Sequence, residues 1–180
     1  MSWVESKPEW GEFLSMLAPG PGEKILDVGA GRGSVAAKVL ESSRGAQVYA
    51  VDPNKKRVSQ MAANFPAIRS SVAGAEELPF PDSNFDKAYT TMALHHYADV
   101  DRGLTEVARV LKKGGGFVIL EMEPGSLMGR MFRFFGSLSG EHMTVMKEEQ
   151  LIAKLRAHGE LEVTKTSRLG PKYLVQLRRI

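Results

Sequence analysis

The 180-residue sequence contains no cysteine. A disulfide framework, a thiolate nucleophile and a thiolate metal site are therefore all excluded. The histidine and carboxylate residues show no spacing typical of a metal-binding site either, so we expect no bound metal.

The sequence also lacks a long hydrophobic run. Nowhere do 18 apolar residues follow one another, and residues 1–13 are polar, with acids and two tryptophans, unlike a signal peptide. We therefore expect no membrane span and a cytoplasmic location. With 43% hydrophobic and 25% charged residues, the composition fits one globular domain covering residues 1–180.

Basic residues only slightly outnumber acidic residues, which gives a net charge of +3. The excess lies in residues 147–180, which carry 8 basic and 4 acidic side chains. A solvated basic face explains this excess most simply, and contact with an anionic partner is the alternative.

Two nucleotide-binding motifs are incomplete or missing. Residues 24–33 read Lys-Ile-Leu-Asp-Val-Gly-Ala-Gly-Arg-Gly, and a dinucleotide fingerprint would need its third glycine at position 34, where the chain has Ser34. No Gly-Lys-Ser/Thr sequence is present, which excludes a triphosphate-binding loop.

What remains is a buried strand, a glycine turn and the start of a helix. Residues 25–28 are suited to a central strand, and glycines follow at every second position before a helical pattern begins near Ser34. Because glycine has no Cβ, the backbone can approach a ligand closely, and the unpaired N–H groups of the helix start point into the same space. The next strand ends in Asp52, a carboxylate able to accept hydrogen bonds from a ribose diol. We therefore predict a small-molecule cofactor site.

Strands and helices alternate along most of the chain. Parallel neighbours need a crossover helix between them, so this order predicts a doubly wound parallel α/β sheet, closed by an antiparallel pair. We predict helices at 9–17, from 34 to about 42, from Asp52-Pro53 to 65, from 100 to a stop at 114–115, and at 147–158, with strands at 25–28, 47–51, 68–73, 88–92, 117–120, 161–167 and 173–178.

The Asp-x-Gly-x-Gly-x-Gly pattern at 27–33, the acid at 52 and the loop at 74–86 resemble the class I S-adenosylmethionine-dependent methyltransferases, and most of all their small-molecule branch, typified by the ubiquinone/menaquinone-biosynthesis enzymes. The resemblance implies a three-layer, Rossmann-like sheet of seven strands, mostly parallel, with a C-terminal antiparallel hairpin. It implies S-adenosylmethionine as cofactor and S-adenosylhomocysteine as product. It assigns cofactor binding to Asp27, Gly29, Ala30, Gly31, Gly33, Asp52, Pro53, Ala75, Glu76 and Thr91.

The loop departs from the family pattern at Gly74. In the related enzymes an Asp or Ser commonly precedes the alanine and accepts a hydrogen bond from the adenine amino group, whereas here Gly74 precedes Ala75. We expect that contact to come from the backbone or from Glu76.

Two absences narrow the methyl acceptor. The Asn/Asp-Pro-Pro-Tyr/Phe loop of amide and base amino-methyltransferases is missing, since residues 91–94 read Thr-Met-Ala-Leu, and covalent C5 methylation of cytosine or uracil needs a cysteine. An oxygen, nitrogen or activated carbon of a small, apolar metabolite is left. His95 and His96 follow strand 88–92 and are candidate general bases, with a purely structural role as the alternative.

Two segments flank this site in the predicted fold. Residues 125–146 include an apolar stripe from Leu127 to Phe135, which predicts a substrate lid, with core packing, dimerisation or membrane-surface contact as alternatives. Residues 1–22 form an N-terminal helix and linker, in which Trp10 either covers the cofactor or packs in the core.

Three functions stay open from the sequence. The first is a small-molecule methyltransferase, and the second is a non-catalytic S-adenosylmethionine-binding regulatory module. The third is a methyltransferase acting on RNA or protein, for which the basic C-terminal residues Arg168, Lys172, Arg178 and Arg179 are the reason. No RNA-binding module is appended, so a small molecule rather than nucleic acid is the expected partner. We expect a monomer or homodimer.

Overall fold

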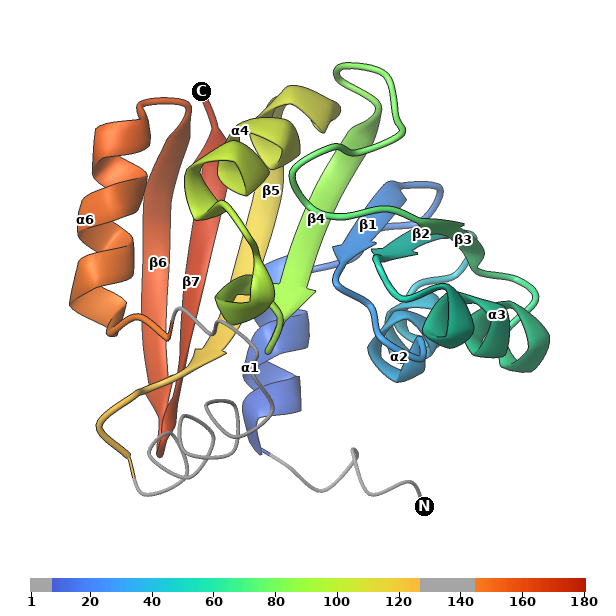
Figure 1. The fold of residues 1–180 in the computed structure, drawn as a ribbon, viewed down its shortest axis with the longest axis horizontal. Coiled ribbons are helices and arrows are strands. Elements are labelled where there is room, and N and C mark those ends of the chain that lie inside the picture. The colour runs from blue at the N-terminus through green and yellow to red at the C-terminus, as the bar shows by residue number, and fades with distance from the viewer. Residues whose placement is uncertain (1–7, 127–144) are drawn as a thin grey trace.

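The computed structural model describes residues 8–126 and 145–180. Its seven strands form one sheet in the order β3-β2-β1-β4-β5-β7-β6 (Figure 1). The pairs from β3 to β5 are parallel, and β7 runs antiparallel to both β5 and β6. This is the doubly wound, Rossmann-like sheet with a C-terminal hairpin that the sequence predicts.

The elements follow the predicted order. The strands are β1 (Lys24–Val28), β2 (Gln47–Asp52), β3 (Arg69–Val72), β4 (Phe85–Thr91), β5 (Leu111–Met122), β6 (Leu161–Leu169) and β7 (Lys172–Arg179). The helices are α1 (Pro8–Leu17), α2 (Ser34–Ser42), α3 (Lys55–Asn64), the single 3₁₀ turn η1 (Leu94–His96), α4 (Val100–Val110) and α6 (Glu148–His158).

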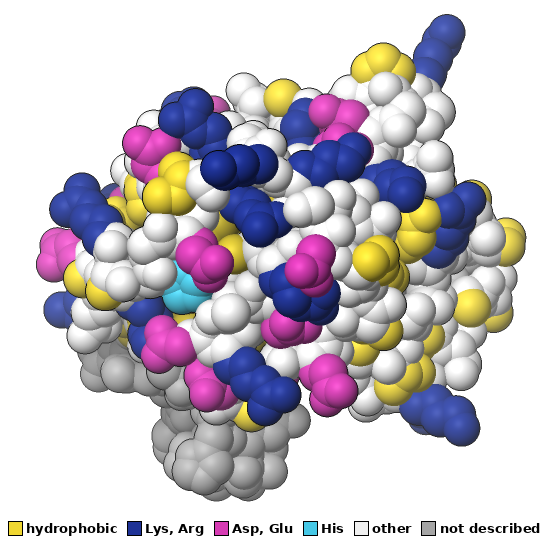
Figure 2. All heavy atoms as spheres, turned by 90° about the horizontal axis from the view of Figure 1, so that it is seen from above, with side chains coloured by type: hydrophobic (Ala, Val, Ile, Leu, Met, Phe, Trp, Pro, Cys, Tyr) yellow, Lys and Arg dark blue, Asp and Glu magenta, His cyan; other side chains and the backbone are white. Residues whose placement is uncertain are grey.

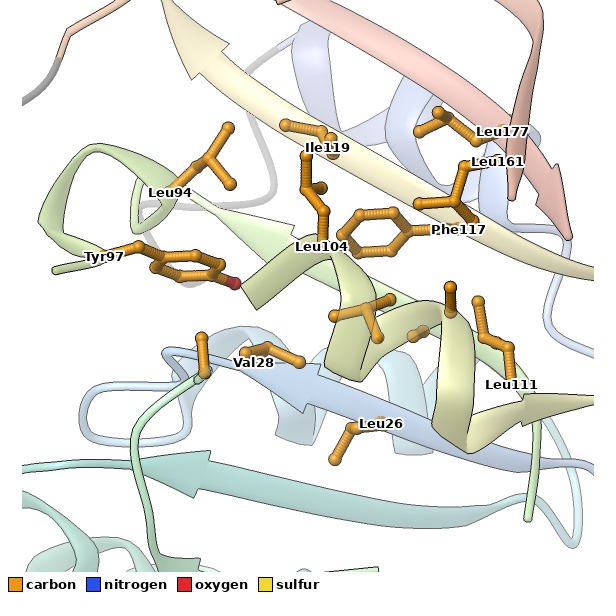
Figure 3. Packing of buried hydrophobic residues seen from close by; sticks show 14 of the residues in the cluster. Leu26, Val28, Leu94, Tyr97, Leu104, Leu111, Phe117, Ile119, Leu161 and Leu177 are labelled. Carbon is orange, nitrogen blue, oxygen red and sulfur yellow. The ribbon is translucent and has the colours of Figure 1, made fainter. Parts of the chain in front are cut away.

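Two apolar layers bury the faces of the sheet. Alternate residues of each strand point to opposite faces, so Leu26 and Val28 join the layer under α4 and α6, while Ile25 joins the layer under α1, α2 and α3. Figure 3 shows the first layer, in which Tyr97 extends from the segment after β4 toward α4. The first layer continues past the carboxyl ends of β3 and β4, through Leu78, Leu94 and Tyr97.

The boundary between α4 and β5 differs from the prediction. We expected a helix to continue to Gly114-Gly115, but α4 ends at Val110 and β5 already starts at Leu111. Leu111 pairs with Phe85 and Gly116 with Lys87, so the residues between them bulge out of the ladder. The glycines therefore belong to a bulged strand rather than to a helix end.

The start of α3 is the second correction. We expected Asp52-Pro53 to open this helix, but Asn54 is its N-cap, and the Asn54 side chain accepts from the backbone N–H groups of Lys56 and Arg57. Pro53 is an exposed residue between β2 and that cap. Asp52 is thus free of a helix-capping role.

The predicted lid at 125–146 falls almost wholly outside the described residues and stays a prediction. α1 is described, and its Trp10 packs edge-on against Phe13, with ring centroids 5.4 Å apart. Phe13 packs in the same way against Tyr89 of β4, so this side of α1 belongs to the core. Within residues 8–126 and 145–180, no helix combines the length and apolar character needed to cross a membrane.

Candidate active site

The glycine loop folds back over the end of β2. The backbone N–H groups of Gly29 and Ala30 both donate to the carbonyl of Val51 at 2.9 Å, and Gly33 donates to Ala30 before serving as the N-cap of α2. These bonds hold the loop at the carboxyl ends of β1 and β2. In open α/β sheets ligands bind at this edge.

Gly29 and Gly31 have different structural roles in this loop. A Cβ on Gly29 would come within 2.5 Å of the Ala93 side chain, so this glycine permits close packing of the loop against the segment after β4. Gly31 has a φ of +58°, and a Cβ there would meet nothing within 4 Å. Gly31 therefore faces open space at the point where the backbone can contact a ligand.

Asp52 connects the end of β2 to the glycine loop. It is 3% exposed; its Oδ2 accepts from the Gly31 N–H at 2.9 Å and its Oδ1 from the Asn54 N–H at 2.9 Å. The guanidinium of Arg57 lies 4.0 Å from Oδ2. Each carboxylate oxygen can accept a second hydrogen bond, so the two hydroxyls of a ribose fit this group while it holds the loop.

Asp27 is a fully buried carboxyl group at the end of β1. Its two oxygens make no hydrogen bond of good geometry among the described residues, and the Tyr89 hydroxyl is the polar group that interacts with it. Burial raises the pKa of Asp27 to about 8, the Tyr89 hydroxyl opposes part of that rise and the charge of Asp52 adds to it. A buried acid without a partner indicates a missing ligand, and a cationic one complements it best.

The loop after β3 is tied to the start of α4. Ala75 is buried in the core layer under α4, and Glu76 accepts from the backbone N–H groups of Ala98 at 2.7 Å and Asp99 at 3.2 Å. A Cβ on Gly74 would come within 2.8 Å of the other Glu76 oxygen. Glu76 therefore has a structural task in this structure, and its predicted contact with adenine stays a prediction.

The segment after β4 brings a buried pair together. His95 is 5% exposed, and its Nδ1 lies 2.8 Å from Oε2 of Glu121, which is 3% exposed on β5. His96 is exposed, with its ring centroid 4.3 Å from that of His95. Thr91 is half-buried at the end of β4. The two histidines thus lie in different environments.

The predicted residues lie at the ends of β1, β2 and β4 and in the loops after β1, β2, β3 and β4. No sequence pattern assigned a role to three of their neighbours. Tyr89 lies opposite Asp27 in the ladder, Ala93 fills the space beside Gly29, and Glu121 holds His95. A signal existed for Glu121, because a carboxylate within the buried strand 117–122 requires a partner. Among the described residues, no cluster of His, Asp and Glu could hold a metal ion.

The sheet order, the glycine loop and the two acids define the class I S-adenosylmethionine-dependent methyltransferase fold. Residues 26–119 match the model of the methyltransferase domain family. The chain belongs to this family. Its cofactor is S-adenosylmethionine, and the two acids and the open space at Gly31 fit that cationic molecule.

Relatives in other organisms share the domain. The chain is 36% identical over 110 residues to a fatty-acid O-methyltransferase of Mycolicibacterium smegmatis, covering 57% of this chain and 38% of that protein. It is 32% identical over 136 residues to a ubiquinone/menaquinone biosynthesis C-methyltransferase of Rickettsia bellii, covering 69% and 54%. The chain thus spans about half the length, or less, of these curated relatives.

A solved structure shares the fold over the full length. An S-adenosylmethionine-dependent methyltransferase from Mesorhizobium loti superposes with a TM-score of 0.82 at 22% identity, covering 98% of this chain and 100% of that one. At this identity the likeness concerns the fold alone.

Proposed function

We propose that this chain transfers the methyl group of S-adenosylmethionine to a small, apolar acceptor. The observation that carries the proposal is the pair of buried acids, Asp27 and Asp52, at neighbouring strand ends around the open side of Gly31. The cofactor supplies an electrophilic methyl group on a positively charged sulfur. Asp27 offers its buried carboxyl group to the cationic end, whose positive charge favours the ionised form of the acid. Asp52 accepts from the ribose.

Methyl transfer requires mainly that donor and acceptor are held in line and shielded from water. Orientation alone is worth roughly 7–11 kcal/mol of the barrier in well-aligned reactions. Ala93, against Gly29, links the cofactor loop to the segment that carries His95, so both regions are fixed relative to one another. Two curated relatives are named for fatty-acid and for quinone-biosynthesis chemistry, and both names point to apolar acceptors.

The macromolecular alternative receives less support from the charged residues. The four basic residues that motivated it all have partners within the chain: Arg168 with Glu148, Lys172 with Glu9, Arg178 with Glu162, and Arg179 with backbone carbonyls at Arg109 and Leu111. On the face shown in Figure 2, basic and acidic side chains are interspersed. Such neutralised pairs favour a solvated surface over a phosphate-binding one.

The test combines binding and transfer. Calorimetry should show binding of S-adenosylmethionine, and a labelled methyl group should pass to an apolar compound in a metabolite extract but not to total RNA or protein. Binding without transfer to any fraction would support the regulatory-module alternative. Transfer to RNA or protein alone would overturn the small-molecule acceptor.

A further inference from the structure

The pair formed by His95 and Glu121 is assembled by tertiary structure. His95 lies on η1 and Glu121 on β5, 26 residues later in the chain, yet Nδ1 and Oε2 are 2.8 Å apart. Both side chains are at least nine-tenths buried. Burying an acid and a histidine costs free energy even when the two are paired. The burial of this pair therefore needs an explanation.

The backbone is bent to bring His95 to this place. Met92, between β4 and η1, has a φ of +52°, a left-handed conformation that is strained for a residue other than glycine. Its N–H donates to the Leu120 carbonyl at 2.8 Å, which fixes the turn to β5 next to Glu121. Strain of this kind persists where the surrounding structure enforces it, and it is concentrated at functional sites.

The hydrogen bond decides which nitrogen of His95 is available. A carboxylate accepts from an N–H, so Glu121 holds the proton of the neutral imidazole on Nδ1 and leaves the lone pair on Nε2. Within residues 8–126 and 145–180, Nε2 has no hydrogen-bond partner and is not among the fully buried unpartnered atoms. Nε2 is therefore the nitrogen able to receive a proton.

The surrounding titratable groups do not compete for this role. His96 lies on the same turn, Tyr97 on the segment that follows and Tyr173 on β7. Burial, and after it the charge of Glu121, raises the pKa of both tyrosines well above the usual range, so they stay neutral. His95 is the histidine that lies within hydrogen-bonding distance of the Glu121 carboxylate.

A base is useful only for some acceptors. A carboxylic acid is already ionised at neutral pH and can attack a methyl group without help, whereas a phenol or enol keeps its proton. Resting on the methyltransferase function proposed above, we infer that the acceptor is a weakly acidic hydroxyl, that His95 Nε2 takes its proton, and that Glu121 is the positioning residue that orients His95.

The step balances in atoms and electrons. The hydroxyl proton passes to Nε2, an oxygen lone pair forms the new O–CH₃ bond, and the C–S bond breaks with its electron pair left on sulfur, which gives S-adenosylhomocysteine. The resulting imidazolium faces the Glu121 carboxylate, which stabilises its charge. The proton leaves to water after the product departs.

The experiment uses two acceptor probes and the full chain. 4-Nonylphenol carries a weakly acidic hydroxyl, and dodecanoate is a carboxylate of similar apolar length. We expect methylation of the phenol and not of dodecanoate. Methylation of dodecanoate alone, or of neither probe by protein that binds S-adenosylmethionine, would overturn the inferred acceptor class and leave the cofactor assignment intact. Absence of cofactor binding would instead overturn the proposed function.

Variants separate positioning from folding. Glu121→Gln keeps the shape of the side chain but removes its charge, and His95→Ala removes the base. General-base catalysis contributes about 10²–10⁴-fold, so His95→Ala should lower kcat by that factor and Glu121→Gln by at least about tenfold, with the KM for the phenol and the cofactor Kd within about twofold. The pH–rate profile should also change in Glu121→Gln, because the carboxylate that faces the imidazolium is gone.

A matched pair elsewhere provides the control. His158 and Glu160 form a second histidine–acid contact, with Nδ1 and Oε2 3.9 Å apart. This pair lies at the C-terminal end of α6. Glu160→Gln should leave kcat and the pH profile unchanged. In ¹⁵N-histidine spectra His95 should carry its proton on Nδ1 in the wild type and shift toward Nε2 in Glu121→Ala. Unchanged kcat and pH profile in Glu121→Gln would return the pair to a structural role.

Discussion

The two regions of the site contain buried acids in opposite situations. Asp27, at the end of β1, makes no hydrogen bond of good geometry among the described residues and faces the Tyr89 hydroxyl, whereas Glu121, on β5, lies 2.8 Å from His95 Nδ1. A buried acid left alone is complete only with a ligand, and a buried acid paired with histidine acts through that histidine. The cofactor region is thus built to receive a charge, and the acceptor region to direct a proton.

The largest expected effect concerns the stability of the cofactor-free protein and its dependence on pH. Between the unfolded value of 3.8 and about 8, native Asp27 keeps a proton that the unfolded chain has released. The unfolded state then binds fewer protons, so the free energy of unfolding falls as pH rises, by about 1.4 kcal/mol per pH unit at most. Asp27→Asn should remove this slope, which amounts to at most about 4 kcal/mol between pH 5 and 8.

Denaturant unfolding at several pH values in that window measures this difference. Glu121→Gln is the comparison variant, because its acid is paired. If the free energy of unfolding depends on pH in the same way in the wild type and in Asp27→Asn, Asp27 does not keep a proton in the native state at neutral pH.

A smaller effect is expected at Asp52. Asp52→Ala removes the acceptor of the Gly31 and Asn54 N–H groups and of the ribose hydroxyls, so cofactor affinity should fall by roughly 1.5–3 kcal/mol, about 10–150-fold. Asp52→Asn retains one acceptor oxygen and should lose less. Calorimetry on folded protein measures both, and an unchanged Kd in Asp52→Ala would remove the residue from the cofactor site.

The smallest expected effect concerns the loop between β3 and β4, which contains Leu78 and Phe80. Arg109 donates to the carbonyls of Phe80 at 2.8 Å and Leu78 at 3.0 Å, while Glu106 accepts from the Leu78 N–H. Lysine cannot reproduce the paired hydrogen bonds of the guanidinium group. Arg109→Lys should therefore lower the free energy of unfolding by about 1 kcal/mol and reduce cofactor affinity only a few-fold.

Arg178→Lys gives the matched control, because Arg178 forms an exposed ion pair with Glu162 on β6. Such pairs contribute about 0–1 kcal/mol, and this change should leave cofactor affinity untouched. Equal effects of the two substitutions on the cofactor Kd would show that Arg109 does not support the site.

The cofactor region could be predicted from sequence because its constraints are local. Glycine spacing, the apolar strand before it and the acid after the next strand are all readable within about thirty residues, and the structure places them at one sheet edge. The acceptor region could not be predicted in the same way. Glu121 lies beside His95 because β4 pairs with β5. The register of this pairing depends on a bulge at the start of β5, which no sequence pattern predicts.

Local patterns also misled where one residue type serves two structures. Gly114 and Gly115 predict a helix stop, yet they lie within β5. Pro53 fits a first helical turn by composition, but the side chain of Asn54 competes successfully for the cap. In both cases a tertiary or capping hydrogen bond outweighed a propensity.

In the proposed function the cofactor passes over the backbone at Gly31. Gly31 and Gly170 have nearly the same φ, +58° and +59°, and a Cβ on either meets nothing within 4 Å, so alanine strains both turns alike. Calorimetry of S-adenosylmethionine binding to Gly31→Ala and Gly170→Ala therefore isolates the ligand contact. We expect at least a tenfold loss of affinity in Gly31→Ala and none in Gly170→Ala. Equal affinities in the two variants would show that the cofactor does not contact the backbone at Gly31.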